Sequence, residues 1–320
     1  KNVNFIRTNI NIKNNLINII KSYFFWRKNL ENYNLDIFET FRLPFFYKFS
    51  KITILTIHDL RYLFSKFSGY KKFFNFVYCK IFLRIIDQFI VVSNSTKKEL
   101  KSKLNFSNIT VIENGIDKKK FKNLSRLLKS KLISNTETKD KLIFTVGHFE
   151  LRKNYLNLIY SIKKLKNFNV KLIIAGNSNS KSEIAYKKHL QNIILKNKLN
   201  YRVKLLSNLT DDEIKILYKK CSLFIFPSIY EGFGIPVLEA ISFNKKIILS
   251  NIAPFKEIIK YDKKIFFDPN NPSDIANKIK SNLKDKKINK KKYREILKFY
   301  QNRILALKIY DLYLKLIKKK

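Results

Sequence analysis

The chain has 320 residues, of which 45% are hydrophobic and 28% are charged. This much apolar material excludes an intrinsically disordered chain, and the length predicts two domains of ordinary size. Lys and Arg outnumber Asp and Glu by 66 to 24, which gives a formal net charge of +42. The basic residues are spread along both halves, and Lys, Asn, Ile, Phe and Tyr are all abundant. We therefore interpret the charge mainly as AT-rich codon bias, and we expect no nucleic-acid partner.

The sequence contains no secretory signal and no run of about 18 uncharged apolar residues. The best candidate span, residues 73–92, is interrupted by Lys80, Arg84, Asp87 and Gln88. The two cysteines, Cys79 and Cys221, lie in apolar stretches without CxxC spacing, which favours a reducing compartment. We expect a cytoplasmic protein. Because the chain has no Met, even at position 1, we also expect its natural start to lie upstream.

Short apolar runs alternate with longer amphipathic stretches, a pattern typical of an α/β fold with parallel strands covered on both faces. The runs predicted to be strands are residues 52–57, 89–92, 109–112, 142–146, 170–175, 203–206, 223–226, 246–249 and 264–267.

A polar, Lys-rich stretch separates the two series of strands. We place the domain boundary within it, which gives an N-terminal domain of residues 1–125 and a second domain of residues 126–295. Apolar residues at helical spacing in residues 296–320 predict a C-terminal helix. We expect this helix to pack back on the N-terminal domain.

Residues 66–84 combine Lys71, Lys72, Lys80 and Arg84 with several aromatic side chains. A basic, aromatic helix lies well at an anionic membrane surface, on the inner face of the cytoplasmic membrane. An amphipathic helix packed on the N-terminal sheet has the same pattern. Both interpretations remain open.

The segment with the strongest chemical signal follows the predicted strand 223–226. It contains Glu231, Gly232 and Gly234, then Pro236 and Glu239. Glycines let the backbone approach a ligand closely, and proline suits the first turn of a helix. This order predicts a phosphate-binding helix amino end at the carboxyl edge of a parallel sheet, with two carboxylates for sugar and ribose hydroxyls.

Glu231 and Glu239 are eight positions apart and resemble the E-x7-E motif of the retaining GT-B glycosyltransferases of family 4. Residues 146–154, Val-Gly-His-Phe-Glu-Leu-Arg-Lys-Asn, resemble the first loop of that family's donor domain, in the form seen among mannosyltransferases and rhamnosyltransferases. Three more segments resemble the family in the right order: residues 56–61 with His58-Asp59, residues 91–100, and residues 112–121. The family's usual opening strand with its Gly-rich loop has no match here.

The resemblance implies a GT-B fold, in which two Rossmann-like domains face each other across a cleft. It assigns catalytic roles to four residues: Glu231 at the donor sugar, Lys153 and Arg152 at the donor diphosphate, and His58 on the acceptor side. Cations at that point would neutralise the charge that develops on the leaving group. The donor-binding residues that it implies are Gly147, His148, Gly232, Phe233, Gly234, Glu239, Ser207, Asn208 and Leu209. Many relatives carry Arg in place of His148, so the charge at that point would depend on pH.

The implied reaction transfers a hexose from a nucleotide sugar, with retention, to a glycan or lipid-linked acceptor of surface polysaccharide biosynthesis. The form of residues 146–154 favours GDP-mannose. We expect no metal and no cofactor, because there is no Asp-x-Asp motif and His58-Asp59 is the only adjacent His-Asp pair. Two alternatives remain: a nucleotide-sugar 2-epimerase of the same fold, and a basic nucleic-acid-binding protein supported by charge alone.

Overall fold

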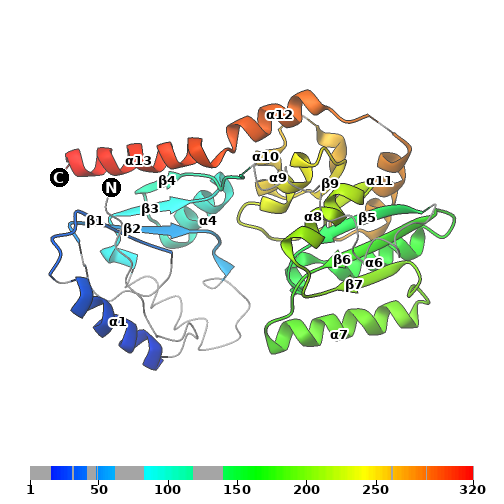
Figure 1. Ribbon diagram of the computed structural model, residues 1–320, viewed down its shortest axis with the longest axis horizontal. Helices are drawn as coiled ribbons and strands as arrows, with labels where there is room; N and C mark the ends of the chain where they lie inside the picture. Colours follow the sequence, from blue (N-terminus) through cyan, green and yellow to red (C-terminus); the bar gives the residue numbers. More distant parts are fainter. Residues whose placement is uncertain are drawn as a thin grey trace. The chain divides into compact units, whose positions relative to one another are not determined.

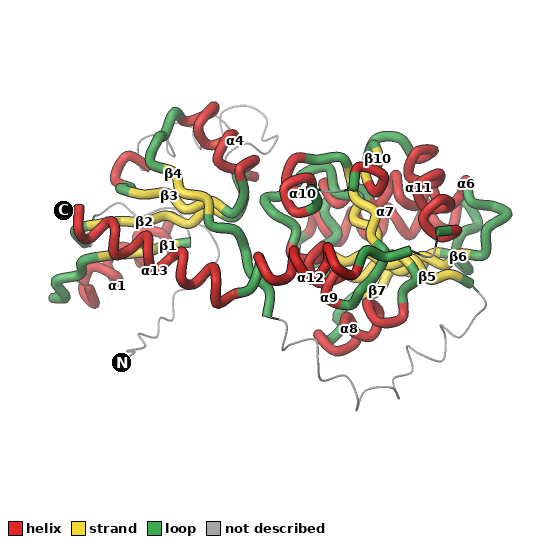
Figure 2. Tube along the Cα trace, turned by 90° about the horizontal axis from the view of Figure 1, so that it is seen from above, coloured by secondary structure: helices red, strands yellow, loops and turns green. Residues whose placement is uncertain are grey.

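The computed structural model describes residues 16–30, 32–41, 48, 50–61, 83–117, 140–260, 262–285 and 287–319. The chain divides into two compact units, each built around one parallel sheet (Figures 1 and 2). The first unit is Lys1–Glu113 together with Ala306–Lys320, and the second is Asn114–Leu305. The expected α/β fold with parallel sheets is confirmed.

The first unit has a four-stranded sheet in the order β1-β2-β3-β4. Its elements are α1 (Leu16–Leu30), β1 (Ile37–Thr40), β2 (Ile52–Ile57), the 3-10 helix η1 (Leu83–Ile85), β3 (Gln88–Val91), α4 (Asn94–Leu104) and β4 (Ile109–Val111). Every residue of β2 is buried, as expected for a central strand of a covered parallel sheet. Helix α4 begins where the Ser93 side chain accepts a hydrogen bond from the Thr96 amide, and its Leu100 and Leu104 pack into the core beside β3.

The last helix, α13 (Asn302–Lys319), contributes residues 306–319 to the first unit. The Tyr313 hydroxyl donates to the Glu39 carboxylate on β1, and Thr56 Oγ1 on β2 donates to Glu39 Oε1 at 2.6 Å. Lys308 Nζ lies 2.8 Å from Glu113 Oε2, just after β4. These contacts attach the helix near both edges of the sheet.

The second unit has six parallel strands in the order β10-β9-β8-β5-β6-β7. Its strands are β5 (Lys141–Val146), β6 (Val170–Ala175), β7 (Val203–Leu206), β8 (Leu223–Phe226), β9 (Ile247–Ser250) and β10 (Phe266–Phe267). Its helices are η3 (Leu151–Lys153), α6 (Tyr155–Lys164), α7 (Lys181–Lys196), α8 (Asp211–Lys220), α9 (Ile235–Ser242), α10 (Ala253–Ile258), η4 (Lys263–Ile265), α11 (Pro272–Lys284) and α12 (Lys290–Phe299).

Both faces of the second sheet are covered, so successive strand residues face different helices. Ile143 of β5 belongs to the core formed with α6 and α11, whereas the ring of Phe144 contacts Tyr218 of α8. Figure 2 shows α6 and α11 on one side of this sheet and α8 on the other. Helices α7 and α8 each begin with a capping box, Ser180 with Glu183 and Thr210 with Glu213, which explains their sharp starts.

The strand predictions correspond closely to the observed strands, with two differences, and the C-terminal tail also differs from its prediction. Strand β1 was not expected. Only Phe266–Phe267 of the predicted strand 264–267 is extended, because the Asp262 side chain caps a 3-10 turn at Lys263–Ile265. The tail contains two helices, α12 and α13, because the chain leaves α12 at Tyr300 and its backbone then pairs with Ile116.

The expected boundary between residues 125 and 126 lies outside the described residues, within residues 118–139. Of the predicted C-terminal segment 296–320, residues up to Leu305 belong to the second unit and those from Ala306 to the first. Most of the basic, aromatic segment 66–84, including Cys79, also lies outside the described residues.

Candidate active site

The site is built where neighbouring parallel strands end. Strands β5 and β8 pair directly, so the loops that follow them emerge side by side at the carboxyl edge of the second sheet. The loop after β5 carries Arg152 and Lys153 on the short helix η3, and the loop after β8 carries Glu231. A backbone hydrogen bond of 2.8 Å from the Ile229 amide to the Arg152 carbonyl ties the two loops together.

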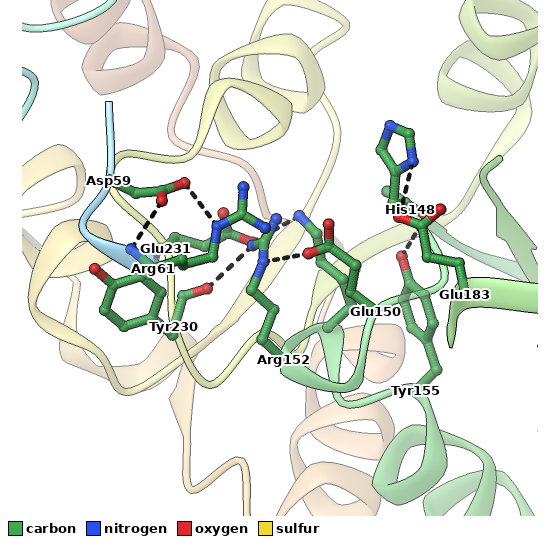
Figure 3. A network of polar contacts seen from close by, with 11 residues as sticks. Asp59, Arg61, His148, Glu150, Arg152, Tyr155, Glu183, Tyr230 and Glu231 are labelled. Carbon is green, nitrogen blue, oxygen red and sulfur yellow. Dashed lines mark hydrogen bonds and ion pairs between the residues drawn. The ribbon is translucent and has the colours of Figure 1, made fainter. Parts of the chain in front are cut away.

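Two cations converge on one carboxylate at this edge, and Figure 3 labels Arg152 and Glu231 within this network. Glu231 Oε1 lies 2.7 Å from Lys153 Nζ and 2.8 Å from Arg152 Nη1. Arg152 Nε also lies 2.5 Å from Glu150 Oε2, and its Nη1 donates to the Tyr230 carbonyl at 3.2 Å. The side chains of Lys153 and Glu231 are only 8% and 12% exposed, so water screens this pair weakly.

Burial and charge compete in setting the pKa values of the buried pair. Burial lowers the pKa of the Lys153 ammonium, and the attraction of Glu231 offsets this only in part. For Glu231, burial favours the neutral acid, but the adjacent Lys153 and Arg152 outweigh it and hold the pKa below its usual value. Glu231 is therefore ionised at neutral pH and accepts hydrogen bonds.

The loop after β5 approaches its neighbours too closely for ordinary side chains. Gly147 has a φ of +150°, and its carbonyl accepts a hydrogen bond from the Tyr155 hydroxyl at 2.9 Å. A Cβ atom on Gly176 would lie 1.9 Å from that same carbonyl oxygen. Asn154, in the left-handed region at φ 56°, ends η3, and its side chain donates to the Pro269 carbonyl at 2.6 Å. This packing sets the direction of Arg152 and Lys153.

The turn after Glu231 leads into α9, whose amino end faces the same edge. Gly234 has a φ of +128°, and a Cβ there would lie 2.9 Å from the Phe255 ring, so this position requires glycine. Pro236 occupies the first turn of α9, as predicted. Gly232 is buried, and so is Phe233, whose ring packs edge-on against Tyr300 with the centroids 5.5 Å apart. Any contact between Phe233 and a bound nucleotide sugar would therefore involve the backbone of Phe233.

Glu239 lies on α9, within the second turn, and its carboxylate is already held by a tyrosine. The Tyr218 hydroxyl of α8 donates to Glu239 Oε2 at 2.7 Å. Burial, and then the nearby carboxylate, raise the pKa of Tyr218 well above its usual value, so it remains a donor. Tyr218 thus orients Glu239, a role that nothing in its sequence position revealed.

The remaining predicted donor-binding residues lie in the loops after β5 and β7. His148, after β5, is exposed, with Nδ1 3.5 Å from Glu183 Oε1 on α7. Ser207 accepts from Lys187 Nζ at 2.7 Å, and that ammonium also lies 5.4 Å from the centre of the Phe149 ring. The Asn208 amide, at φ 57°, donates to Asn177 Oδ1 at 2.9 Å. Leu209 is half-buried beside them.

Lys187 and Asn177 therefore shape this loop, and neither was predicted from the sequence. Lys187 is one of many lysines on amphipathic helices, and no spacing distinguishes it from the others.

His58 belongs to the first unit, where it directly follows β2. Its ring is exposed and stacks on Phe41, with the centroids 6.2 Å apart. The neighbouring Asp59 accepts from the Arg61 backbone amide at 3.1 Å and from Arg61 Nε at 2.8 Å. The His-Asp element thus lies at the carboxyl end of a buried strand, with Asp59 held by Arg61.

Sequence profiles of known families match nearly the whole chain. The family described as Glycosyl transferases group 1 matches residues 128–299, and Glycosyltransferase Family 4 matches residues 1–120. The chain belongs to the group 1 glycosyltransferases. The family resemblance that we drew from Glu231, Glu239 and residues 146–154 is confirmed.

The relatives of this group 1 glycosyltransferase include proteins from archaea and bacteria. An uncharacterized glycosyltransferase of Methanocaldococcus jannaschii is 32% identical over 59% of this chain and 49% of its own length. The O-antigen chain mannosyltransferase RfbU of Salmonella typhimurium is 28% identical over 64% of this chain and 54% of its own length. The chain therefore spans about half the length of these curated relatives.

A crystal structure of a glycosyltransferase from Rickettsia africae has the same fold. It superposes with a TM-score of 0.76 at 21% sequence identity, over 98% of this chain and 85% of that chain.

The described residues of this glycosyltransferase contain no group of three or more His, Cys, Asp or Glu side chains placed to hold a metal ion. Among the same residues, no helix combines the length and the apolar character needed to cross a bilayer. Cys221 is buried, and burial raises the pKa of its thiol to about 12, as expected for a structural cysteine.

Proposed function

We propose that the chain transfers a hexosyl group from a nucleotide sugar to a glycan or lipid-linked acceptor, with retention at the anomeric carbon, and that the donor is GDP-mannose. One observation carries the proposal: Arg152 and Lys153 meet Glu231 where β5 and β8 end, beside the amino end of α9. The mannosyltransferases among the relatives, such as RfbU of Salmonella typhimurium, support a mannosyl donor.

In this proposal, Arg152 and Lys153 bind the donor diphosphate. Both are near-buried cations, and a cation in a site with little water stabilises the leaving group's developing charge strongly. The positive end of the α9 helix dipole would add to this effect. Two cations and a helix terminus can supply the charge that a metal ion supplies elsewhere, so we propose a metal-independent reaction without a cofactor.

Glu231 would then change partners. Without donor, its carboxylate forms ion pairs with both cations. Once a diphosphate occupies the cations, Glu231 Oε1 can accept hydrogen bonds from hydroxyls of the transferred sugar. Glu239, oriented by Tyr218, is placed to accept from the two ribose hydroxyls. The backbone of Ser207, Asn208 and Leu209 would contact the nucleobase, and His58 would serve the acceptor side.

The membrane and lipid-linked acceptors belong to the same proposal. One relative is named an O-antigen chain mannosyltransferase, which supports a glycan of surface polysaccharide biosynthesis as acceptor. A lipid-linked acceptor would require the chain to work at the inner face of the cytoplasmic membrane. Nucleic acid has no place in this reaction.

The proposal is tested by incubating the purified chain with GDP-mannose, UDP-glucose or UDP-N-acetylglucosamine, with and without oligosaccharide and prenyl-diphosphate-linked acceptors. We expect nucleoside diphosphate release to be fastest from GDP-mannose, and proton NMR of the product to show the anomeric configuration of the donor. Lys153→Ala should lower turnover at least about 100-fold, because it removes a charge that acts on the leaving group. Lys164→Ala, which changes an exposed lysine on α6, is the matched control.

Equal turnover in Lys153→Ala and Lys164→Ala would contradict the site assignment. An inverted anomeric configuration would contradict retention. A new nucleotide sugar formed without any acceptor would instead favour the 2-epimerase alternative.

A further inference from the structure

Helix α13 is apolar on two faces, and within the part of the chain that the structure describes only one of them is used for packing. The inner face holds the helix on the first unit through Tyr313 to Glu39 and Lys308 to Glu113. The outer face carries four large apolar side chains that we call the α13 stripe: Leu307, Tyr310, Leu314 and Ile317. These side chains are 54%, 56%, 39% and 44% exposed.

The spacing of the α13 stripe places its members on one line along the helix. Steps of three, four and three residues keep side chains on one face of a 3.6-residue helix. Single exposed apolar residues are ordinary on protein surfaces, but four in a row form a contiguous patch, and such patches mark interaction sites.

The charges around the stripe select the kind of partner. Lys315, Lys318 and Lys319 are exposed at the carboxyl end of α13, and Asp311 is the exposed acidic residue of the helix. Positive charges therefore outnumber negative charges around the α13 stripe, and the whole chain carries a formal net charge of +42. A second copy would bring like charges together. Four half-exposed side chains also fall well short of the roughly 800 Å² per partner that a stable protein interface buries.

We propose that the α13 stripe is a membrane-docking face, which lies in the headgroup region of an anionic bilayer while Lys315, Lys318 and Lys319 contact lipid phosphates. A helix lying in the interface buries its apolar side to about 5–10 Å, and basic side chains at its edge add electrostatic attraction. The 18-residue helix lies on the membrane and does not cross it. This inference concerns the surface of the first unit and does not depend on the donor chemistry.

The test measures co-sedimentation of the full chain with vesicles of phosphatidylcholine, with or without phosphatidylglycerol, at physiological ionic strength. The protein's general positive charge is largely screened there, because the Debye length is about 8 Å. We expect binding to the phosphatidylglycerol vesicles alone. In the double variant Leu314→Gln and Ile317→Gln, the apparent affinity should fall about tenfold or more, because burying a side chain of this size is worth at least that factor.

The matched control is the double variant Ile184→Gln and Leu195→Gln on α7, which changes two equally apolar side chains that are more exposed (55% and 63%), without changing the charge. We expect this control to bind like the unaltered chain. Lys315→Gln with Lys318→Gln should weaken binding more at low than at high ionic strength. Circular dichroism and thermal unfolding check that all variants keep their fold.

Insertion itself is tested with Tyr310→Trp in a Trp26→Phe background, which leaves one indole on the stripe. Its emission should shift to the blue on anionic vesicles, and lipids brominated on the acyl chain should quench it. Three results would each overturn the proposal: no binding by the unaltered chain at any ionic strength, equal loss in the α13 and α7 variants, or a dimer in light scattering that the stripe variant abolishes.

Discussion

Lys153 Nζ lies 2.7 Å from Glu231 Oε1, although 78 positions separate the two residues in the chain. The pair forms because β5 and β8 are neighbours in a parallel sheet, so that the loops after them share one edge. Arg152 joins it at 2.8 Å, and this three-residue cluster is the feature on which the proposed chemistry depends.

A double-mutant cycle should show that the pair is strongly coupled. Removing one partner of a near-buried ion pair leaves an uncompensated charge and costs about 3 kcal/mol or more. Removing both partners leaves no uncompensated charge of the pair. We therefore expect Lys153→Met to destabilise the chain clearly, and Lys153→Met with Glu231→Gln to recover part of the loss. Urea unfolding of the four proteins measures the coupling. Strict additivity would contradict a direct interaction.

The stability contribution of Glu231 should depend on pH in the acidic range. Its pKa is lowered in the folded state, so the unfolded chain binds a proton first as the pH falls below about 4.3. The contribution of Glu231 is complete above that pH, and it is lost as the pH falls through the lowered value. Unfolding curves of the unaltered chain and of Glu231→Gln should therefore converge on acidification. A pH-independent difference would exclude this assignment.

Turnover should also fall at alkaline pH earlier than an ordinary lysine would allow. Burial lowers the pKa of Lys153, so its ammonium loses the proton below the usual value of about 10.4. The basic limb of the pH–rate profile should lie below that pH and should shift upward in Lys153→Arg, since guanidinium stays charged. If the limb is unchanged in this variant, another group sets it.

Gly176→Ala should disturb the donor loop through a steric clash. The new Cβ would lie 1.9 Å from the Gly147 carbonyl oxygen, so one of the two strand ends must move. Overpacking of this kind costs about 1–3 kcal/mol or more, which urea unfolding can measure. Lys181→Ala, an exposed change on the next helix, should leave stability nearly unaltered. A Gly176→Ala chain as stable as this control would show that the loop yields easily.

The attachment of α13 should weaken when the Tyr313 hydroxyl is removed. Tyr313→Phe removes one of the two hydroxyls that donate to Glu39 and leaves that of Thr56. The lost hydrogen bond costs about 1–2 kcal/mol of local stability. Hydrogen exchange of the α13 amides should become faster, while exchange in β5 stays unchanged. Tyr310→Phe, on the outer face, is the control, and equal exchange in both variants would argue against this attachment.

Much of the site could be read from local sequence. The glycines and Pro236 specify a turn and a helix start through backbone conformation, which short segments encode directly. Apolar runs specified eight of the strands to within one residue at each end, because a strand buried on both faces must be apolar throughout. Strand β1, with the sequence Ile-Phe-Glu-Thr, was not predicted because Glu39 breaks its apolar run. The partners of Glu39 are Thr56 on β2 and Tyr313, which is 274 positions away.

The sequence alone therefore determined the two parallel α/β units, the family, and the residues at the carboxyl edge of the donor-side sheet, because these depend on short apolar runs, turn residues and motif spacing. Only the tertiary structure decided which groups meet: Arg152 and Lys153 with Glu231, Tyr218 with Glu239, and Lys187 with Ser207. It also decided that α13 uses one apolar face for packing and leaves the other exposed. These are side-chain contacts between distant segments, and their distances follow from strand order and helix packing, which no local pattern contains.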